Sequence, residues 1–265
     1  MVKLLLVTLF SISSAQASVH HAHVRIITPL AVSLRSDIAT RKDASFETLL
    51  HRWQTRYGTQ AVDPLFSLAA DSANPDADRY VALMGAAKLG GYATSARVAH
   101  FLGDPAWMMR SGAIRLLTAF QDKPSSARIL SLLRDKALVV RLEAVSAVAK
   151  LRPAGAANAL VAAALDPNNY HGGKALWVPH RALDALAALD AREQAPKLAP
   201  LLTHENDPAL QHRTVETLDR LAGHSTGGPA ESLAKRVLAW KAELATDQVP
   251  TSAAHGGRRP IVTIE

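Results

Sequence analysis

Residues 79–89 read RYVALMGAAKL, and the same unit returns as RSGAIRLLTAF at residues 110–120 and as RLEAVSAVAKL at residues 141–151. The leading arginines follow one another at 31-residue intervals (110 − 79 and 141 − 110). The segments between them, SARVAHFLGD from Ser95 and SARILSLLRD from Ser126, keep the same interval, so each period holds two elements. A period near 30 residues with two amphipathic helices indicates a repeat array, because a single helical hairpin cannot bury its apolar face alone.

The composition favours closely packed helices. Hydrophobic residues make up 48% of the chain and aromatic residues 5%, so that alanine and leucine supply most of the apolar side chains. A sheet would contain more β-branched and aromatic residues. The chain has no cysteine, which excludes disulfides, zinc–thiolate sites, iron–sulfur clusters and cysteine nucleophiles. Its net charge of +7 favours acidic partners.

Residues 1–17, MVKLLLVTLFSISSAQA, are typical of a secretory signal peptide. Lys3 supplies the positive start, residues 4–12 the short apolar core, and Ala15-Gln16-Ala17 the cleavage site. An apolar core of this length is too short to span a bilayer, which takes about 20 residues. We therefore expect a mature protein that begins at Ser18, has no membrane span after cleavage and is periplasmic or secreted.

The expected mature amino terminus has a spacing that suits a metal ion. If cleavage follows Ala17, the chain starts Ser18-Val19-His20. The α-amine, two backbone amides and the imidazole of His20 can then form a square-planar nitrogen set, which suits Cu(II) or Ni(II). A solvated His-containing tail is the alternative.

The array is expected to begin with a capping repeat. We expect residues 18–43 to be an extended lead-in, because they alternate poorly and contain Pro29. Ser45 is placed to cap an amphipathic helix that stops at Gly58, and a second helix covers residues 64–70. Terminal repeats of this kind close the exposed apolar end of an array.

The following units place Asp or Asn, often with Pro, before the first helix of each pair, as a helix start requires; these residues are Asn74, Asp104, Asp135, Asp166 and Asp207. The second helices are expected near residues 93–103, 124–134, 155–165, 194–203 and 229–245. We thus predict an all-α fold over residues 44–245, a right-handed α-solenoid of about five to six helical hairpins. Residues 246–265 are predicted to be a disordered tail.

The units DPAWMMRSGAIRLL, DKALVVRLEAVSAV and DPALQHRTVETLDRL share an Asp and, six positions later, an Arg. This pattern resembles the short HEAT-like repeats also found in phycobilin lyase subunits, over about residues 60–245. The resemblance implies an armadillo-type α-solenoid used for protein binding or assembly, and also suggests a lyase-like maturation accessory. It further implies a structural ladder between neighbouring repeats, formed by Asp104, Arg110, Asp135, Arg141, Asp207 and Arg213.

The fourth unit departs from the pattern. Arg181 follows Asp166 by fifteen positions (181 − 166) instead of six, and residues 167–180 contain the inserted stretch. Insertions in a solenoid form loops on one edge, often the binding edge. This loop carries Tyr170, His171, Lys174 and Trp177 as candidate partner-binding residues. The alternative is a neutral elongation with Trp177 folded over the core.

The second helices are expected to line the concave side of the solenoid, and basic residues recur on their exposed face. Helical periodicity turns Val98 and Ile129 inward and leaves Arg97, His100, Arg128 and Arg134 outside. Lys197, Lys235 and Arg236 extend the row after a gap at Ala159. Such a strip would attract a protein partner with an acidic surface, although a solvated charged face is the alternative. Nucleic acid is not expected, because no aromatic–basic stacking platform is present.

The sequence gives little sign of catalysis. Gly223-His224-Ser225-Thr226-Gly227 matches G-x-S-x-G, but it is expected between two helices, where Gly223 ends a helix, rather than on a strand–helix elbow. There is no H-E-x-x-H motif and no Gly-rich phosphate loop. The leading hypothesis is therefore an exported, non-enzymatic scaffold with no cofactor. An exported Cu(II) or Ni(II) handler and a lyase-like accessory are the alternatives.

Overall fold

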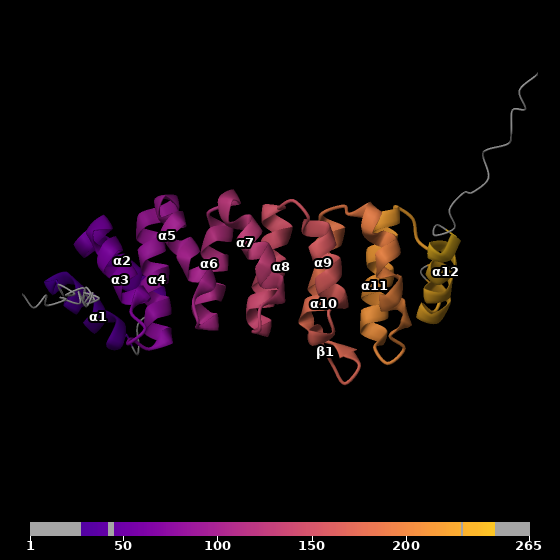
Figure 1. Cartoon of the computed structure of the whole chain (residues 1–265), viewed down its shortest axis with the longest axis horizontal. Helices are drawn as coiled ribbons and strands as arrows, with labels where there is room; N and C mark the ends of the chain where they lie inside the picture. The colour runs from indigo at the N-terminus through magenta and orange to yellow at the C-terminus, as the bar shows by residue number, and fades with distance from the viewer. Residues whose placement is uncertain (1–27, 42–44, 229, 247–265) are drawn as a thin grey trace, which may run out of the picture.

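The computed structural model describes residues 28–41, 45–228 and 230–246, and there it consists of helices and one short hairpin. The helices stand side by side in a single row that follows the chain from one end to the other (Figure 1). The predicted all-α solenoid is confirmed. The predicted signal peptide, the predicted metal ligands Ser18, Val19 and His20 and the predicted tail from residue 247 lie outside the described residues.

The array starts earlier than the sequence suggests, with helix α1 (Pro29–Ala39). The expectation of an extended lead-in is wrong there, because Pro29 occupies the first turn, where its missing N–H costs nothing. Thr28 caps the helix by accepting a bond from the N–H of Ala31. Leu34 and Ile38, four residues apart, are buried, and α1 packs against α3 and α4.

The capping hairpin follows as predicted. Helix α2 (Phe46–Tyr57) begins after Ser45, whose hydroxyl accepts the N–H of Thr48, and it ends at Gly58, which has a φ of 53°. A 3-10 turn η1 (Gly58–Ala61) leads into α3 (Val62–Ala70). The sequence therefore locates this hairpin to within about two residues.

The first helices of the repeats, called A helices here, form one layer in which each packs on the next. They are α4 (Asp76–Gly90), α6 (Trp107–Ala119), α8 (Leu138–Leu151), α10 (Trp177–Ala188) and α11 (Pro208–Ala222). Ala82, Ala113 and Ala144, which share the 31-residue interval, are fully buried. Small side chains at these positions let the backbones of neighbouring helices approach closely.

The second elements, called B elements, form the other layer, and several are short. They are α5 (Ser95–His100) between η2 (Gly91–Thr94) and η3 (Phe101–Gly103), α7 (Ser126–Ser131) between η4 (Lys123–Ser125) and η5 (Leu132–Arg134), α9 (Ala156–Leu165), η7 (Arg192–Thr203) and α12 (Leu233–Thr246). Val98 and Ile129 are buried as predicted. Element η7 is a 3-10 helix, because Pro196 and Pro200 lack the N–H groups that α-helical bonding needs.

A buried tryptophan holds each end of the array. Trp53 in α2 donates its indole N–H to Asp37 in α1 at 3.0 Å. Trp240 in α12 donates to Asp219 in α11 at 2.9 Å. Both rings are almost completely buried. Each indole thus has its polar partner, and each terminal helix is fixed to its neighbour.

Candidate functional site

Consecutive repeats are joined by buried ion pairs. Two nitrogens of Arg110 donate to the two carboxylate oxygens of Asp135 in the next repeat, both at 2.7 Å. The remaining nitrogen, Nη1, donates to the backbone carbonyls of Asp104 at 2.8 Å and Pro105 at 2.9 Å. The two charged side chains are less than a tenth exposed. The pair therefore serves repeat stacking, as the resemblance implies, and is not open to a ligand.

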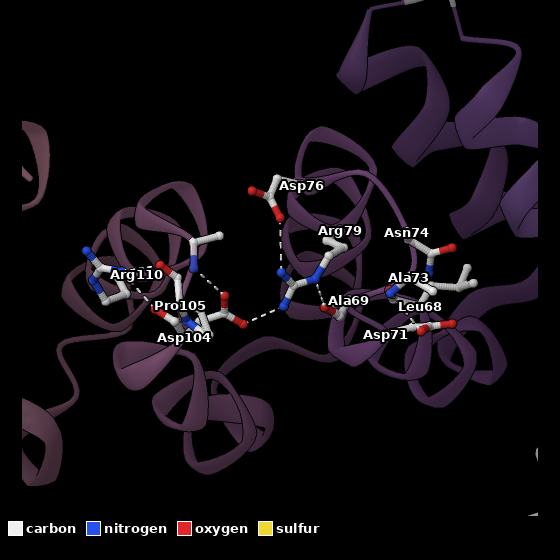
Figure 2. Close-up of polar contacts among 11 residues, drawn as sticks. Leu68, Ala69, Asp71, Ala73, Asn74, Asp76, Arg79, Asp104, Pro105 and Arg110 are labelled. Atoms are coloured by element: carbon white, nitrogen blue, oxygen red, sulfur yellow. Dashed lines mark hydrogen bonds and ion pairs between the residues drawn. The ribbon is translucent and has the colours of Figure 1, made fainter.

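Arg79 repeats this arrangement one unit earlier (Figure 2). It reaches Asp104 of the next repeat, Asp76 in its own helix and the carbonyl of Ala69. Burial alone would lower the pKa of Arg79, but the bonds and charges of Asp104 and Asp76 outweigh burial and raise it. Arg79 consequently stays charged inside the array.

Asp135 shows the complementary effect. Burial would raise its pKa, yet the hydrogen bond from Arg110 and the backbone N–H of Ala137 outweigh burial. The pKa of Asp135 therefore lies below its usual range. Asp135 is therefore ionised near neutral pH, and we call its pair with Arg110 a rung of the ladder.

The ladder position is the fourth residue of each A helix. Arg79, Arg110 and Arg141 hold it in α4, α6 and α8, and His180 and Gln211 hold it in α10 and α11. The assignment of Arg213 to the ladder is wrong, since Arg213 is partly exposed and pairs with Asp184 and Glu216. Asp104 lies three residues before the first residue of α6, whereas Asp207 lies directly before α11 and caps it. The residue six positions after the aspartate is therefore the fourth residue of α6 but the sixth residue of α11.

The insertion in the fourth unit forms a β-hairpin at one edge of the solenoid, as predicted (Figure 1). The turn η6 (Pro167–Asn169) leads into β1 (Tyr170–His171), which pairs antiparallel with β2 (Lys174–Ala175). Gly172 and Gly173 connect the strands with φ values of 56° and 76°. Two consecutive positive φ angles are the signature of a tight two-residue hairpin turn, which favours glycine.

The hairpin is anchored through buried polar groups on both sides. Asn169, fully buried, accepts a bond from Arg141 at 2.8 Å and so takes the place of the missing ladder aspartate. On the other side Asp207 accepts the N–H of Ala175 at 2.7 Å. The hydroxyl of Tyr170 donates to the carbonyl of Ala164 at 2.6 Å. The hairpin is therefore held in place from both neighbouring repeats.

The contacts that anchor the hairpin also shift the pKa values of Tyr170 and Asp207. Burial, with the charge of Asp207, raises the pKa of Tyr170 to about 12. Burial would also raise the pKa of Asp207, but the backbone N–H groups of Ala175 and Leu210 outweigh it, so that this pKa is lowered. The ring of Tyr170 stacks on His204 with centroids 5.0 Å apart. Tyr170, predicted to bind a partner, is thus occupied in holding the hairpin.

The other candidate residues of the insertion face outward. His171 and Lys174 are exposed on the two strands. Trp177, the first residue of α10, is 64% exposed, so the alternative in which it folds over the core is wrong. An exposed tryptophan next to two basic side chains is an available contact surface.

In the structure, fewer residues of the predicted basic strip are available to a partner than the sequence suggests. Arg97 is exposed but bound, with its guanidinium paired to Asp63 and lying 4.0 Å from the ring centre of Phe66. Arg236 is paired with Asp219, and Lys197 donates to the side-chain oxygens of Asn158 and Gln194. These contacts engage three members of the predicted row.

Arg128 and Arg134 remain available. Both are exposed, and within the described part of the chain neither guanidinium has a carboxylate within 4.0 Å. His100 is also exposed on the same layer. The strip is thus concentrated on α7 and η5 rather than spread along the solenoid.

A groove lies directly beside these two arginines. It separates α7 and η5 from α9 and has a volume of about 610 Å³. Its lining is mainly apolar and small, with two charged side chains: Ala127, Leu130, Ser131, Leu133, Arg134, Ala159, Ala162, Ala163, Asp166 and Pro167. We call it the α7–α9 groove. Ala159, where the predicted basic row is interrupted, lines this groove. The small alanine side chains of α9 leave the space between the B elements unfilled.

The G-x-S-x-G match lies in the loop after α11, which ends at Gly223 with a φ of 77°. The hydroxyl of Ser225 donates to Asp219 at 3.0 Å, while His224 contacts Glu243. The hydrogen bond that His224 donates to the carboxylate of Glu243 raises the pKa of this exposed imidazole. This loop fixes α12 to α11. Across the described ranges no group of three His, Cys, Asp or Glu side chains could hold a metal ion.

The fold and the inter-repeat ladder define a HEAT-type α-solenoid. A family model described as HEAT repeats matches residues 94–171, from the turn before α5 to the hairpin. No curated protein matches the chain. Within the described residues, no helix is both long and apolar enough to cross a membrane.

Two solved structures are similar at 16% sequence identity. One is an engineered protein, with a TM-score of 0.44 over 73% of this chain and 98% of that chain. The other is the complex of CpcE and CpcF of phycocyanin lyase from Nostoc sp. PCC7120, with a TM-score of 0.32 over 80% of this chain and 94% of that chain.

Proposed function

We propose that the protein is an exported, non-enzymatic scaffold, periplasmic or secreted, that binds an acidic segment of a protein partner in the α7–α9 groove. The observation that carries the proposal is the groove itself, a mainly apolar depression of about 610 Å³ with two charged side chains in its wall, Arg134 and Asp166. The carboxylate of Asp166 accepts bonds from Asn168. HEAT-type arrays bind other proteins along the surfaces that their stacked helices create.

The chemistry of the groove favours one kind of segment. Its alanine and leucine side chains offer apolar area, which suits apolar side chains of a partner. Arg128 and Arg134 carry charges that no carboxylate within 4.0 Å neutralises in the described residues. Arginine is enriched in protein interfaces, because its planar guanidinium binds carboxylates at two points. The matching segment therefore combines small apolar residues with aspartate or glutamate.

The ladder supplies the rigidity that such a scaffold needs. The pair of Arg110 and Asp135 joins the repeat that carries α7 to the next repeat. Arg141 bonds Asn169 in η6, the turn that follows α9. Both walls of the groove are thereby fixed before a partner arrives. A preformed site loses little conformational entropy on binding, which raises the affinity for a given contact area.

The test uses a photo-crosslinking amino acid in place of Ala162, an exposed residue of the groove. Crosslinked partner peptides from the exported fraction are identified by mass spectrometry. We expect peptides with net negative charge, and at least about a tenfold loss of crosslinking in the R128E/R134E variant, because charge reversal turns attraction into repulsion. The signal should also weaken with added salt.

The matched control is K150E/R220E, which changes the net charge equally at exposed residues of α8 and α11. It should crosslink like the wild type. The proposal is wrong if R128E/R134E crosslinks as well as the wild type, or if the peptides carry no excess of acidic residues. Export is tested separately by the mass of the protein recovered outside the cytoplasm, which should begin at Ser18.

A further inference from the structure

Three consecutive A helices expose an apolar side chain in their first turn. Trp107 is the first residue of α6, Val139 the second residue of α8 and Trp177 the first residue of α10. Their exposed fractions are 46%, 44% and 64%. Large apolar side chains with this exposure are infrequent in the described residues, and these three lie in the first turns of successive A helices.

The three residues lie along one edge of the solenoid. The A helices stand parallel in the row, and α10 begins at the edge from which the hairpin projects (Figure 1). Helices packed side by side are about 8–10 Å apart, so the row of side chains extends over roughly 20 Å.

Basic side chains accompany this row. Lys136 lies in the turn before α8, Lys174 on β2 and Arg181 in the first part of α10; all three are exposed. None of them has a carboxylate within 4.0 Å among the residues that the structure describes.

The carboxylates of the same turns are engaged. Asp104 and Asp135 are turned inward to the arginines of the ladder. Asp166 accepts bonds from the backbone and the side chain of Asn168. The edge therefore presents indole rings and cationic side chains to the solvent. We call Trp107, Lys136, Val139, Lys174 and Trp177 the Trp edge.

We propose that the Trp edge docks the solenoid on the surface of an anionic lipid bilayer. Indole rings favour the water–lipid boundary, because the ring is apolar and its N–H keeps a polar partner. Lysine side chains next to them are attracted to anionic headgroups, while their aliphatic stems lie along the apolar region. Because the three residues lie in the first turns of consecutive A helices, one surface can contact them together.

The same features argue against a protein as the occupant of this edge. Protein interfaces are depleted in lysine at their centres and bury their aromatic anchors in pockets of the partner's surface. Two of the three cations that accompany the Trp edge are lysines and the third is Arg181, whereas both cations considered for the α7–α9 groove are arginines. The edge and the groove thus differ in chemistry, and the lipid proposal does not depend on the function proposed for the groove.

The test uses tryptophan fluorescence of the full chain mixed with vesicles. Of the four tryptophans, Trp53 and Trp240 are buried and Trp107 and Trp177 are exposed. Vesicles of brominated phosphatidylcholine with phosphatidylglycerol should quench the exposed pair and leave the buried pair bright. Residues 1–17 contain no tryptophan, so any contact they make with lipid is silent in this measurement. Vesicles of brominated phosphatidylcholine alone should quench at least about tenfold less at equal lipid.

Two pairs of variants make the test specific. W107S/W177S should lower vesicle co-sedimentation at least about tenfold, whereas Y92S/L238S, which removes two equally exposed apolar side chains elsewhere, should not. K136E/K174E should weaken binding far more than K150E/R220E, which changes the charge equally at the far ends of α8 and α11. Circular dichroism of each variant confirms that it is folded.

The proposal is overturned if the full chain shows no quenching, if W107S/W177S sediments like the wild type, or if both charge variants behave alike. It is also overturned if the Trp edge binds poly-L-glutamate and not vesicles, which would make it a protein-binding surface. Loss of vesicle binding with intact crosslinking in the groove would reject this inference and leave the proposed scaffold function in place.

Discussion

Arg110 and Asp135 face each other through two hydrogen bonds of 2.7 Å, each from a different guanidinium nitrogen to a different carboxylate oxygen. The arginine belongs to one repeat and the aspartate to the next, so the pair fixes how the two repeats stack. Buried pairs of this kind contribute less to net stability than to the choice of one arrangement, because desolvation of both charges offsets their attraction. The ladder therefore sets the register of the array.

Removing one partner of this rung is expected to be costly. In R110M the carboxylate of Asp135 stays buried without its cation, and we expect a loss of about 3–5 kcal/mol in the free energy of unfolding. In R110M/D135N the loss should be about 1–3 kcal/mol smaller than the sum of the two single variants. Urea unfolding of the four proteins measures this coupling. Strict additivity would show that the rung is not energetically coupled.

The same aspartate predicts how stability depends on acid. The pKa of Asp135 is lowered in the folded state, so its contribution is complete above its ordinary value of 3.8 and is lost as the pH falls through the folded value. The difference in unfolding free energy between the wild type and D135N should thus be constant from pH 5 to pH 7 and shrink below about pH 4. Urea unfolding at each pH provides the measurement. A difference that grows in acid would contradict the assignment.

Gly85 lies where α4 closely contacts α2, so that a larger residue there is expected to destabilise the fold. A Cβ at Gly85 would lie 2.5 Å from a ring carbon of Trp53, whose indole is held by Asp37. Overpacking costs about 1–3 kcal/mol, which exceeds the gain of about 1 kcal/mol in helix propensity. We expect G85A to lower the melting temperature and G103A, which has open space, to leave it unchanged or raise it. Equal effects of both would reject this explanation.

Asp207 should control the order of the hairpin. It accepts the N–H of Ala175 and, as the cap of α11, the N–H of Leu210. Removing both acceptors in D207A should cost about 1–3 kcal/mol and speed proteolysis at Gly172-Gly173. The control E205A changes an exposed residue of the adjoining loop and should be neutral within about 0.5 kcal/mol. Unchanged cleavage in D207A would mean that the hairpin is held by other contacts.

Much of the fold could be predicted because the repeat is visible in the sequence as a regular interval of 31 residues. The interval between Arg79, Arg110 and Arg141 predicted the architecture, since stacked units place equivalent residues in equivalent environments. The resemblance placed Arg110 and Arg141 in the ladder but not Arg79, which the structure adds to it. Helix α1 was missed because Pro29 was weighed as a breaker. The signal that could have located it is the spacing of Leu34 and Ile38, four residues apart.

The ladder in the last two units could not be predicted from spacing. A count from Asp207 leads to Arg213, but the helix begins directly after the aspartate, and the fourth residue is Gln211. The helix start depends on which residue caps it, and this is decided by packing rather than by local pattern. In the fourth unit the insertion moves the aspartate away altogether, and Asn169 replaces it.

The candidate sites were predicted only in part. His171 and Lys174 are exposed on the hairpin and Trp177 at the start of α10, but Arg97 is engaged by Asp63, a residue 34 positions away. The α7–α9 groove was missed, because a depression arises where side chains fail to fill the space between helices. Its signal was the run of alanines in residues 156–164. Trp107 was not singled out because its relation to Val139 and Trp177 becomes visible only with the helix starts.

The hydrogen bonds from Trp53 to Asp37 and from Trp240 to Asp219 close the array at its ends without any part in the ladder between them. A duplicated block of residues 104–134, inserted after Arg134, would bring an aspartate to accept Arg110 and an arginine to reach Asp135. The number of repeats can therefore change during evolution or by design while both termini keep their present neighbours.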